Sequence, residues 1–312
     1  MYLQINHRQY LIVIAMVRLL LIRSGILSFT MPELPEVETI AKRLRAVLPG
    51  KIIKKIKVLR NKSFSGNPDE LAGSKIIGIE RRSKIISIKL LNQQYLLIHL
   101  KMTGQLLYVD GAVRLGGGHP TDDFVDSLPS KHTRVEIFFT DKTILYFNDM
   151  RVFGWIKLVD ETGRNKEFAL LAPDITDSEI TVEYLLKTFA KRKQPIKQVI
   201  MDNSVVAGVG NIYASDALHL ARIHPARPAL TLSSEEVGRL LTSMQTVIQL
   251  GIELGGATIQ HYKNVEGLIG HYQDVRRVYA REGEPCRDCG THILRMKQGG
   301  RSTFYCPKCQ QI

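Results

Sequence analysis

The sequence is organised around residues 31–39, which read Met-Pro-Glu-Leu-Pro-Glu-Val-Glu-Thr. If translation starts at Met31 and that methionine is removed, Pro32 becomes the amino terminus and its nitrogen becomes a free secondary amine. An α-amino group has a pKa of about 7.7–8.0, so a useful fraction is unprotonated near neutral pH. Such an amine needs little activation to act as a nucleophile, and Glu33 stands next to it. The stretch therefore predicts covalent chemistry at Pro32.

The same stretch also opens a helix. Proline suits the first turn of a helix, and carboxylates favour the positive end of the helix dipole. Apolar residues then recur at helical spacing until a Pro-Gly pair at 49–50 ends the pattern: Val37, Ile40, Leu44 and Val47. This structural interpretation accounts for the motif from Pro35 onward only.

Charge points to a polyanionic partner. The chain has 312 residues, 44% of them apolar and 23% charged, with a formal net charge of +13. This length fits about two domains of a globular protein. The positive surplus favours nucleic acid ahead of an acidic membrane surface as the partner.

Residues 1–30 differ from the rest of the chain, because they carry arginines and no acidic residue. Their apolar runs, 11–17 and 19–22, are split by Arg18 and closed by Arg23. A spanning helix needs about 20 apolar residues, and a central arginine costs about 2.5–3.5 kcal/mol on insertion. We therefore expect no membrane anchor, but either a mis-called start ahead of Met31 or a cleaved segment.

The spacing of the cysteines is the strongest sign of a specific site that the residues give by themselves. Cys286-x2-Cys289 and Cys306-x2-Cys309 use all four cysteines of the chain, at the spacing of a zinc ribbon. Disulfides are the alternative, but two Cys-x2-Cys pairs in a basic chain with no other cysteine argue against them. The spacing predicts one structural Zn²⁺ that holds a β-hairpin too small to bury a core of its own.

From residue 31 to the C-terminus, the chain resembles the formamidopyrimidine-DNA glycosylase family, first through Pro-Glu-Leu-Pro-Glu-Val-Glu-Thr. The resemblance implies a DNA glycosylase and abasic-site lyase that excises oxidised purines, 8-oxoguanine or formamidopyrimidine, from duplex DNA. Pro32 would attack C1′ of the deoxyribose to give a cationic iminium, and β,δ-elimination would follow. Glu33 would relay protons, and Glu36 would support the site electrostatically.

The resemblance also assigns roles along the chain. Lys84 and Arg301 would assist the elimination steps while contacting phosphate. Three side chains would fill the void left by the extruded nucleotide: Met102, Arg151 and Phe153. His132 and Asn211 would contact phosphate, whereas Arg192 and Lys197 are phosphate candidates because they lie in the basic cluster 191–197. The family pattern is broken at Val152, where a second arginine is usual, and at Asp216, where glutamate is usual.

The expected fold is α+β, with an antiparallel β-sandwich and a flanking helix followed by a helix–two-turns–helix domain and a zinc-finger hairpin. We expect five segments: an extension (1–30), the catalytic sandwich (31–160), a hinge (161–197), the helical DNA-binding domain (198–283) and the finger (284–312). Residues 110–130 are rich in Gly, Asp and Pro and predict a long loop. Pro173 and Asp174 start the predicted helical region, and Asn211 caps a predicted helix. Another helix is predicted over residues 233–254, starting from a Ser-x-x-Glu capping box at Ser233.

Two other functions remain open at this point. An endonuclease VIII-like enzyme would act on oxidised pyrimidines, although the Gly-containing stretch 255–279 resembles the loop that closes over a purine. A binder of damaged DNA without activity would result if residues 1–30 stayed attached to Pro32. The resemblance further implies a monomer in the bacterial cytoplasm, associated with the nucleoid, that acts on duplex DNA and not at a membrane.

Overall fold

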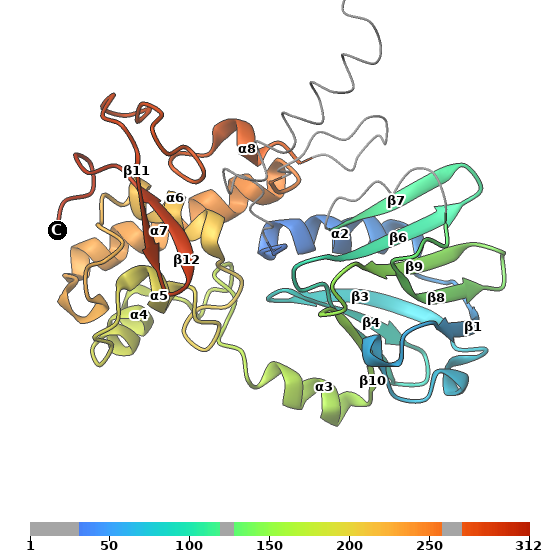
Figure 1. The fold of residues 1–312 in the computed structure, drawn as a ribbon. Coiled ribbons are helices and arrows are strands. Elements are labelled where there is room, and N and C mark those ends of the chain that lie inside the picture. The colour runs from blue at the N-terminus through green and yellow to red at the C-terminus, as the bar shows by residue number, and fades with distance from the viewer. Residues whose placement is uncertain (1–30, 119–127, 258–269) are drawn as a thin grey trace, which may run out of the picture. The chain divides into compact units, whose positions relative to one another are not determined.

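Strands dominate the first half of the chain and helices the second (Figure 1). The structure is a computed structural model that describes residues 31–118, 128–257 and 270–312. Residues Pro32–Ile312 form one compact unit. Within the described ranges, no helix has the length and apolar character needed to cross a membrane.

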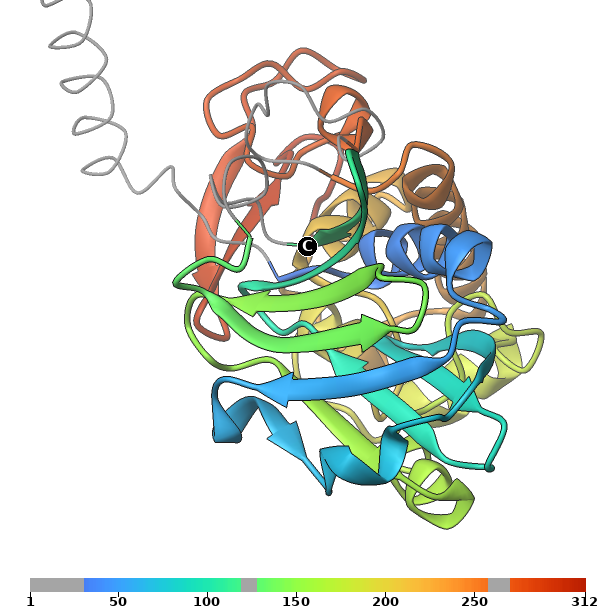
Figure 2. The same ribbon diagram turned by 90° about the vertical axis from the view of Figure 1, so that its right-hand side faces the viewer.

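Two five-stranded sheets form the sandwich, which appears as two layers in Figure 2. The first sheet has the order β1-β8-β9-β6-β7, with strands β1 (Ile53–Val58), β8 (Thr133–Phe139), β9 (Ile144–Asp149), β6 (Gly104–Asp110) and β7 (Val113–Gly118). The second has the order β2-β10-β5-β4-β3, with strands β2 (Phe64–Ser65), β10 (Trp155–Val159), β5 (Tyr95–His99), β4 (Ile85–Leu90) and β3 (Ile76–Arg82). All pairings are antiparallel except β2 with β10, so the predicted antiparallel sandwich is confirmed.

The helix predicted after Pro35 is α2 (Leu34–Val47), and it joins two hydrophobic cores. Val37, Ile40 and Leu44 pack into the core of the sandwich. Leu34, one turn earlier, packs into the separate core formed by the later helices. The amino-terminal motif is therefore fixed by both halves of the unit.

The predicted loop at 110–130 is wrong in its first part, because β7 (Val113–Gly118) pairs with β6. Glycine was the basis of the loop prediction, but here it serves close packing. A Cβ on Gly117 would lie 2.8 Å from a side-chain carbon of Ile40, so only glycine lets α2 approach this strand. Residues 119–127 lie outside the described ranges.

Helices follow the sandwich: α3 (Glu161–Phe168), α4 (Val182–Phe189), α5 (Ile196–Ile200), α6 (Asn211–Leu220), α7 (Ser234–Glu253) and α8 (Tyr272–Val275). The helical region predicted from Pro173-Asp174 onward contains these later helices, and its first helix, α4, begins at Val182 with Thr181 as its N-cap. Asp174 is held in a polar network. The capping box predicted at Ser233 is confirmed, because Ser233 and Glu236 bond each other's backbone N–H groups.

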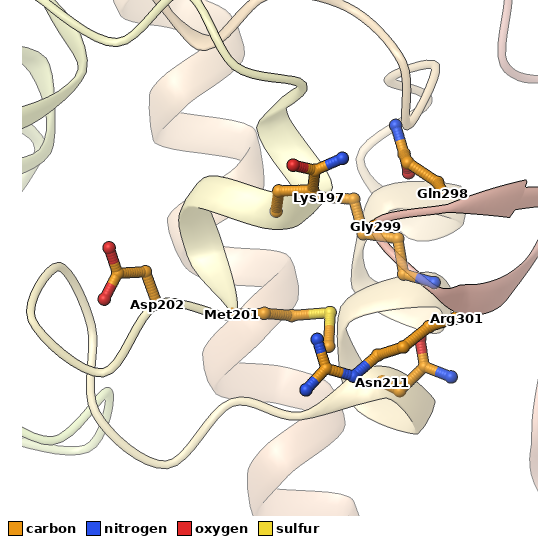
Figure 3. A pocket seen from close by; sticks show the side chains of 8 residues that line it. Lys197, Met201, Asp202, Asn211, Gln298, Gly299 and Arg301 are labelled. Carbon is orange, nitrogen blue, oxygen red and sulfur yellow. The ribbon is translucent and has the colours of Figure 1, made fainter.

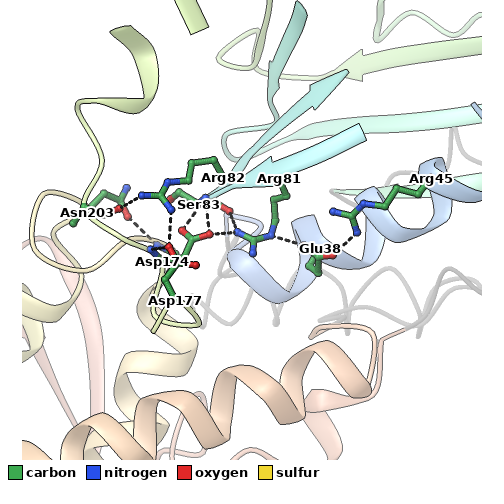
Figure 4. Close-up of polar contacts among 10 residues, drawn as sticks. Glu38, Arg45, Arg81, Arg82, Ser83, Asp174, Asp177 and Asn203 are labelled. Atoms are coloured by element: carbon green, nitrogen blue, oxygen red, sulfur yellow. Dashed lines mark hydrogen bonds and ion pairs between the residues drawn. The ribbon is translucent and has the colours of Figure 1, made fainter. Parts of the chain in front are cut away.

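The polar network around Asp174 joins the strands to the helical half (Figure 4). Arg81 at the end of β3 donates to the Asp174 carboxylate at 2.7 Å and to the carbonyl oxygen of Ser83 at 2.9 Å. The same carboxylate accepts the backbone N–H of Ser83 at 2.9 Å. The Asp174 and Arg81 side chains are only 4% and 8% exposed, so the pair is buried. It fixes the turn that carries Lys84.

Asp174→Asn should destabilise the protein by about 3 kcal/mol, because it removes one of the two carboxylates that pair with the buried charge of Arg81, the other being Glu38. Denaturant unfolding of both proteins measures this difference. Asp177→Asn is the matched control, since Asp177 pairs with Arg82 at a half-exposed position and should cost about 1 kcal/mol or less. Equal losses in the two variants would contradict the assignment of the buried pair.

Candidate active site and nucleic-acid interface

The carboxylate of Glu33 is bound to the start of helix α6. It accepts the backbone N–H of Ile212 at 3.0 Å and that of Tyr213 at 3.4 Å, and Glu33 is 3% exposed. The first N–H groups of a helix have no partner within the helix and carry its positive dipole end. Glu33 thus caps a helix that lies about 180 residues further along the chain, and the residue after Pro32 is anchored there.

The prediction that Asn211 caps α6 is wrong, because Gly210 is the N-cap and Asn211 the first helical residue. Glycine is required at this cap by the approach of Glu33. A Cβ on Gly210 would lie 2.1 Å from the Cδ of Glu33, and one on Gly208 would lie 2.3 Å from a Leu34 methyl carbon. The Gly-Val-Gly stretch therefore admits the amino-terminal motif, and the Ile212 and Tyr213 N–H groups are occupied by Glu33.

Glu36 supports Glu33 from one turn along α2. Its carboxylate accepts the backbone N–H of Glu33 at 2.9 Å, the hydroxyl of Tyr213 at 2.8 Å and the N–H of Ala257 at 2.7 Å. The supporting role predicted for Glu36 therefore has specific contacts, and Tyr213 is a supporting residue that the sequence did not reveal.

Burial sets the protonation of the acids and the amine. It raises the pKa of Glu33 to about 7, against the opposing charge of Lys84, and it also raises the pKa of Glu36. Burial likewise lowers the pKa of Lys84, which is 4% exposed and donates to the Val209 carbonyl at 3.4 Å. Glu33 can therefore hold a proton near neutral pH, and the Lys84 amine loses its proton more readily than usual.

A polar pocket lies between helices α5 and α6 and the finger hairpin (Figure 3). Its lining residues are Lys197, Gln198, Met201, Asp202, Asn211, Gln298, Gly299 and Arg301. Three predicted contact residues, Lys197, Asn211 and Arg301, thus come together from separate elements. Arg301 is exposed beside the two-residue Gly299-Gly300 turn of the hairpin.

The three pocket residues differ in their hydrogen bonds. Asn211 donates to the Ser302 carbonyl at 3.2 Å, while its Oδ1 has no partner among the described residues. Lys197 donates to the hydroxyl of Thr303 at 2.9 Å, and burial lowers the pKa of Lys197 to about 7. The pocket gathers donors suited to an anionic oxygen such as that of a phosphate.

The predicted void fillers form a second group on two turns of the sandwich. A guanidinium nitrogen of Arg151 lies 3.4 Å from the Met102 sulfur, and the guanidinium carbon lies 4.7 Å from the centre of the Phe153 ring. Phe153 is 47% exposed although it is a large apolar residue. An exposed Met–Arg–Phe cluster of this kind is suited to stacking on bases.

Residues with a left-handed backbone conformation (positive φ) lie next to several of the candidate site residues. Ser83 (φ 53°) precedes Lys84, Lys101 (φ 52°) precedes Met102, and Val152 (φ 56°) separates Arg151 from Phe153. A positive φ is costly for any residue except glycine and most unusual for a β-branched one. Strain of this kind collects at functional sites, and the sequence gives no sign of it. Val152 therefore shapes the turn where the family usually has arginine.

The remaining candidates have local partners. Arg192 lies 3.5 Å from Asp202 in an ion pair at the edge of the polar pocket. His132 comes directly before β8, and its backbone N–H donates to the hydroxyl of Ser130 at 3.1 Å. Asp216 accepts the N–H groups of Arg277, Val278 and Tyr279 and the hydroxyl of Tyr272. Its role is thus to fix the segment that leads into the finger.

The finger provides four sulfurs for a metal. Its hairpin is β11 (Leu294–Gln298) and β12 (Arg301–Tyr305), and none of the four cysteines forms a disulfide in the structure. The sulfurs of Cys286 and Cys309 lie 3.9 Å apart, and those of Cys289 and Cys306 lie 3.4 Å apart. A tetrahedral zinc with Zn–S bonds of about 2.3 Å needs sulfurs about 3.8 Å apart, so the residues fit one structural Zn²⁺. The ion would hold the hairpin closed and take no part in the chemistry.

Three family models match the chain in order. They are the formamidopyrimidine-DNA glycosylase N-terminal domain at residues 31–156, the formamidopyrimidine-DNA glycosylase H2TH domain at 171–263, and the zinc finger found in FPG and IleRS at 283–312. The first model begins at Met31, so the extension 1–30 lies outside every match.

Similar proteins cover about nine-tenths of the chain. The formamidopyrimidine-DNA glycosylase of an Exiguobacterium species is 42% identical over 289 residues, covering 90% of this chain and all of that protein. That of Pelotomaculum thermopropionicum is 38% identical with the same coverage. Among solved structures, a mutant Lactococcus lactis FPG bound to Fapy-dG-containing DNA has a TM-score of 0.81 at 30% identity, covering 90% of this chain and all of that one. The Lactococcus lactis Fpg with abasic-site DNA gives 0.81 at 29%.

Glu33→Gln should make stability less sensitive to pH. A raised pKa means that the folded protein holds the Glu33 proton more tightly than the unfolded chain. The resulting stabilisation is complete below about pH 4.5 and is lost as the pH rises through about 7. The wild type should therefore lose about 3 kcal/mol relative to Glu33→Gln between pH 4.5 and 8, at about 1.4 kcal/mol per pKa unit. Denaturant unfolding across this range measures it.

Glu235→Gln is the control for the change of charge, because the Glu235 side chain is 86% exposed. A constant difference between wild type and Glu33→Gln at all pH values would show that the Glu33 carboxylate does not carry this linkage.

Proposed function

The chain belongs to the formamidopyrimidine-DNA glycosylase family, and we propose that it excises oxidised purines from duplex DNA through the nitrogen of Pro32. It is a DNA glycosylase and abasic-site lyase of base-excision repair. Neither a pyrimidine-directed enzyme nor an inactive binder is favoured by these relatives. The observation that carries the proposal is the buried acid Glu33, anchored on α6 beside Lys84 and directly after Pro32.

The reaction starts at the secondary amine. Pro32 attacks C1′ of the extruded deoxyribose, a bond forms between its nitrogen and C1′, and the bond from C1′ to the purine breaks as the base leaves with a proton. Glu33, protonated near neutral pH, gives its proton to the ring oxygen O4′ as the sugar opens. The product is an iminium between Pro32 and C1′.

Elimination follows from this iminium. The positive nitrogen draws electrons from C2′, whose proton passes to a base, and the 3′ phosphate leaves. The Lys84 amine, with its lowered pKa, is the candidate that assists this step. Lys197, Asn211 and Arg301 hold a phosphate in the polar pocket, and Arg301 favours departure of the second phosphate.

Side chains that fill the void lower the free-energy cost of extruding the nucleotide. Unstacking costs a few kcal/mol, and an inserted apolar side chain offsets part of that cost. Met102 and Phe153 supply apolar surface, and Arg151 supplies donors for the orphaned cytosine. His132 and Arg192 add polar or positively charged contacts to the phosphate backbone of the DNA. We further propose that the enzyme works as a monomer on nucleoid DNA in the bacterial cytoplasm.

Borohydride should trap Pro32 on lesion DNA. In a chain that starts at Met31 and loses it, reduction of the iminium gives a covalent protein–DNA adduct, and peptide mapping by mass spectrometry should locate the adduct at Pro32. Pro32→Gly should greatly weaken trapping, whereas Pro35→Ala, a matched change in the same motif, should leave it in place.

Retention of residues 1–30 should also abolish the adduct, because the Pro32 nitrogen is then an amide. An adduct at Lys84, or undiminished trapping by the extended chain, would show that another amine performs the reaction. Binding of lesion DNA without trapping would support the inactive binder.

Val152→Gly should stabilise the free protein by about 1 kcal/mol, because glycine adopts a positive φ without strain. The turn then loses rigidity, so affinity for lesion DNA should fall several-fold. Denaturant unfolding and DNA titration measure the two effects. Gln93→Gly, at φ 63° in the turn between β4 and β5, should give a similar stability gain with no loss of affinity. If Val152→Gly binds as tightly as wild type, the strained turn has no part in recognition.

A further inference from the structure

His219, in the last turn of α6, lies against the zinc finger. It is 1% exposed, and its Nε2 is 3.3 Å from the sulfur of Cys286. Its ligand atom and the sulfurs of Cys286, Cys306 and Cys309 all lie within 4.8 Å of one another. His219 is therefore either a zinc ligand in place of Cys289 or a hydrogen-bond donor to a zinc-bound thiolate.

The sulfur positions favour four cysteine ligands. Cys289 is 3.4 Å from Cys306 across the two Cys-x2-Cys hooks, close to the spacing that a shared zinc requires. A structural zinc with four sulfurs is closed, so no position remains for an imidazole.

The other ring nitrogen decides against the ligand alternative. Nδ1 of His219 is buried and has no hydrogen-bond partner among the described residues. If Nε2 bound zinc, the ring proton would have to sit on Nδ1, where a buried donor would be left unpaired. Metal-bound histidines almost always donate that proton to a partner. With the proton on Nε2, the only donor of the ring points at the sulfur, and only an acceptor stays unpaired.

We propose that His219 donates its Nε2–H to the zinc-bound thiolate of Cys286 and acts as a positioning residue for the metal. The hydrogen bond withdraws charge from the sulfur and holds it at its place in the tetrahedron. It also ties the last turn of α6 to the finger, while the first turn of the same helix binds Glu33. The rate at which the protein loses zinc therefore depends on His219. The identity of the four zinc ligands does not depend on it.

The test uses the full, metal-loaded chain with Zn²⁺ or Co²⁺ and the variants His219→Phe and His219→Gln. Cobalt spectra should show four sulfur ligands in the wild type and in both variants. Transfer of Zn²⁺ to a chromogenic chelator should be about tenfold faster in His219→Phe, since loss of such partners weakens metal binding about 10–100-fold. His219→Gln keeps an amide donor and should restore part of the difference.

His224→Phe is the matched control, because His224 is a second buried histidine that packs on the finger hairpin. The centres of the His224 and Tyr305 rings lie 4.8 Å apart. The His224→Phe variant should release zinc at the wild-type rate. A wild-type cobalt spectrum with a nitrogen ligand, altered in His219→Phe, would overturn the proposal. Equal release from His219→Phe and wild type would also overturn it.

Imidazole ¹⁵N spectra of the wild-type zinc protein keep the proposal testable if the phenylalanine variant fails to fold. The Nε2–H tautomer of His219 supports the donor role, and the Nδ1–H tautomer contradicts it.

Discussion

A single capping interaction organises the site: the carboxylate of Glu33 satisfies the free N–H groups at the start of α6. Because Glu33 follows Pro32 directly, the position of Pro32, the proposed nucleophile, is set by a helix in the other half of the unit. Two glycines leave room for Glu33 and Leu34, and Leu34 extends the contact into the helical core. The sandwich and the helices are thus joined next to the proposed nucleophile.

The same interaction accounts for the electrostatics. Burial penalises the charged form of both Glu33 and Lys84, while their mutual attraction opposes the penalty in each. An acid with a raised pKa and an amine with a lowered pKa are therefore held in one buried environment. Glu36 and Tyr213 fix the acid from the side, and the network of Arg81 and Asp174 fixes the turn of Lys84. Position and protonation thus follow from one arrangement of buried groups.

Local patterns in the sequence predict local structure well. The spacing of the cysteines predicted the finger, and the Ser-x-x-Glu pattern predicted the start of α7. The resemblance supplied the family, which the comparisons confirm. The residue roles that it implied remain predictions.

Features that depend on contacts between residues far apart in the sequence were not predicted. Gly117 looked like part of a loop because its partner Ile40 is far away in sequence, and Asn211 looked like a cap because Glu33 could not be seen to compete with it. The strain at Val152 is a backbone property that no residue pattern records. His219 could not be identified because its partner Cys286 lies 67 residues further along the chain.

The separation of Glu33 from its helix has a consequence for biosynthesis. The two groups lie 179 residues apart, so a ribosome adding about 5–20 residues per second needs roughly 10–40 s to make the second after the first. In a chain initiated at Met31, α6 does not yet exist during that interval and so could not enclose Pro32. Removal of Met31 in that interval would precede the enclosure of Pro32 by the helical half of the unit.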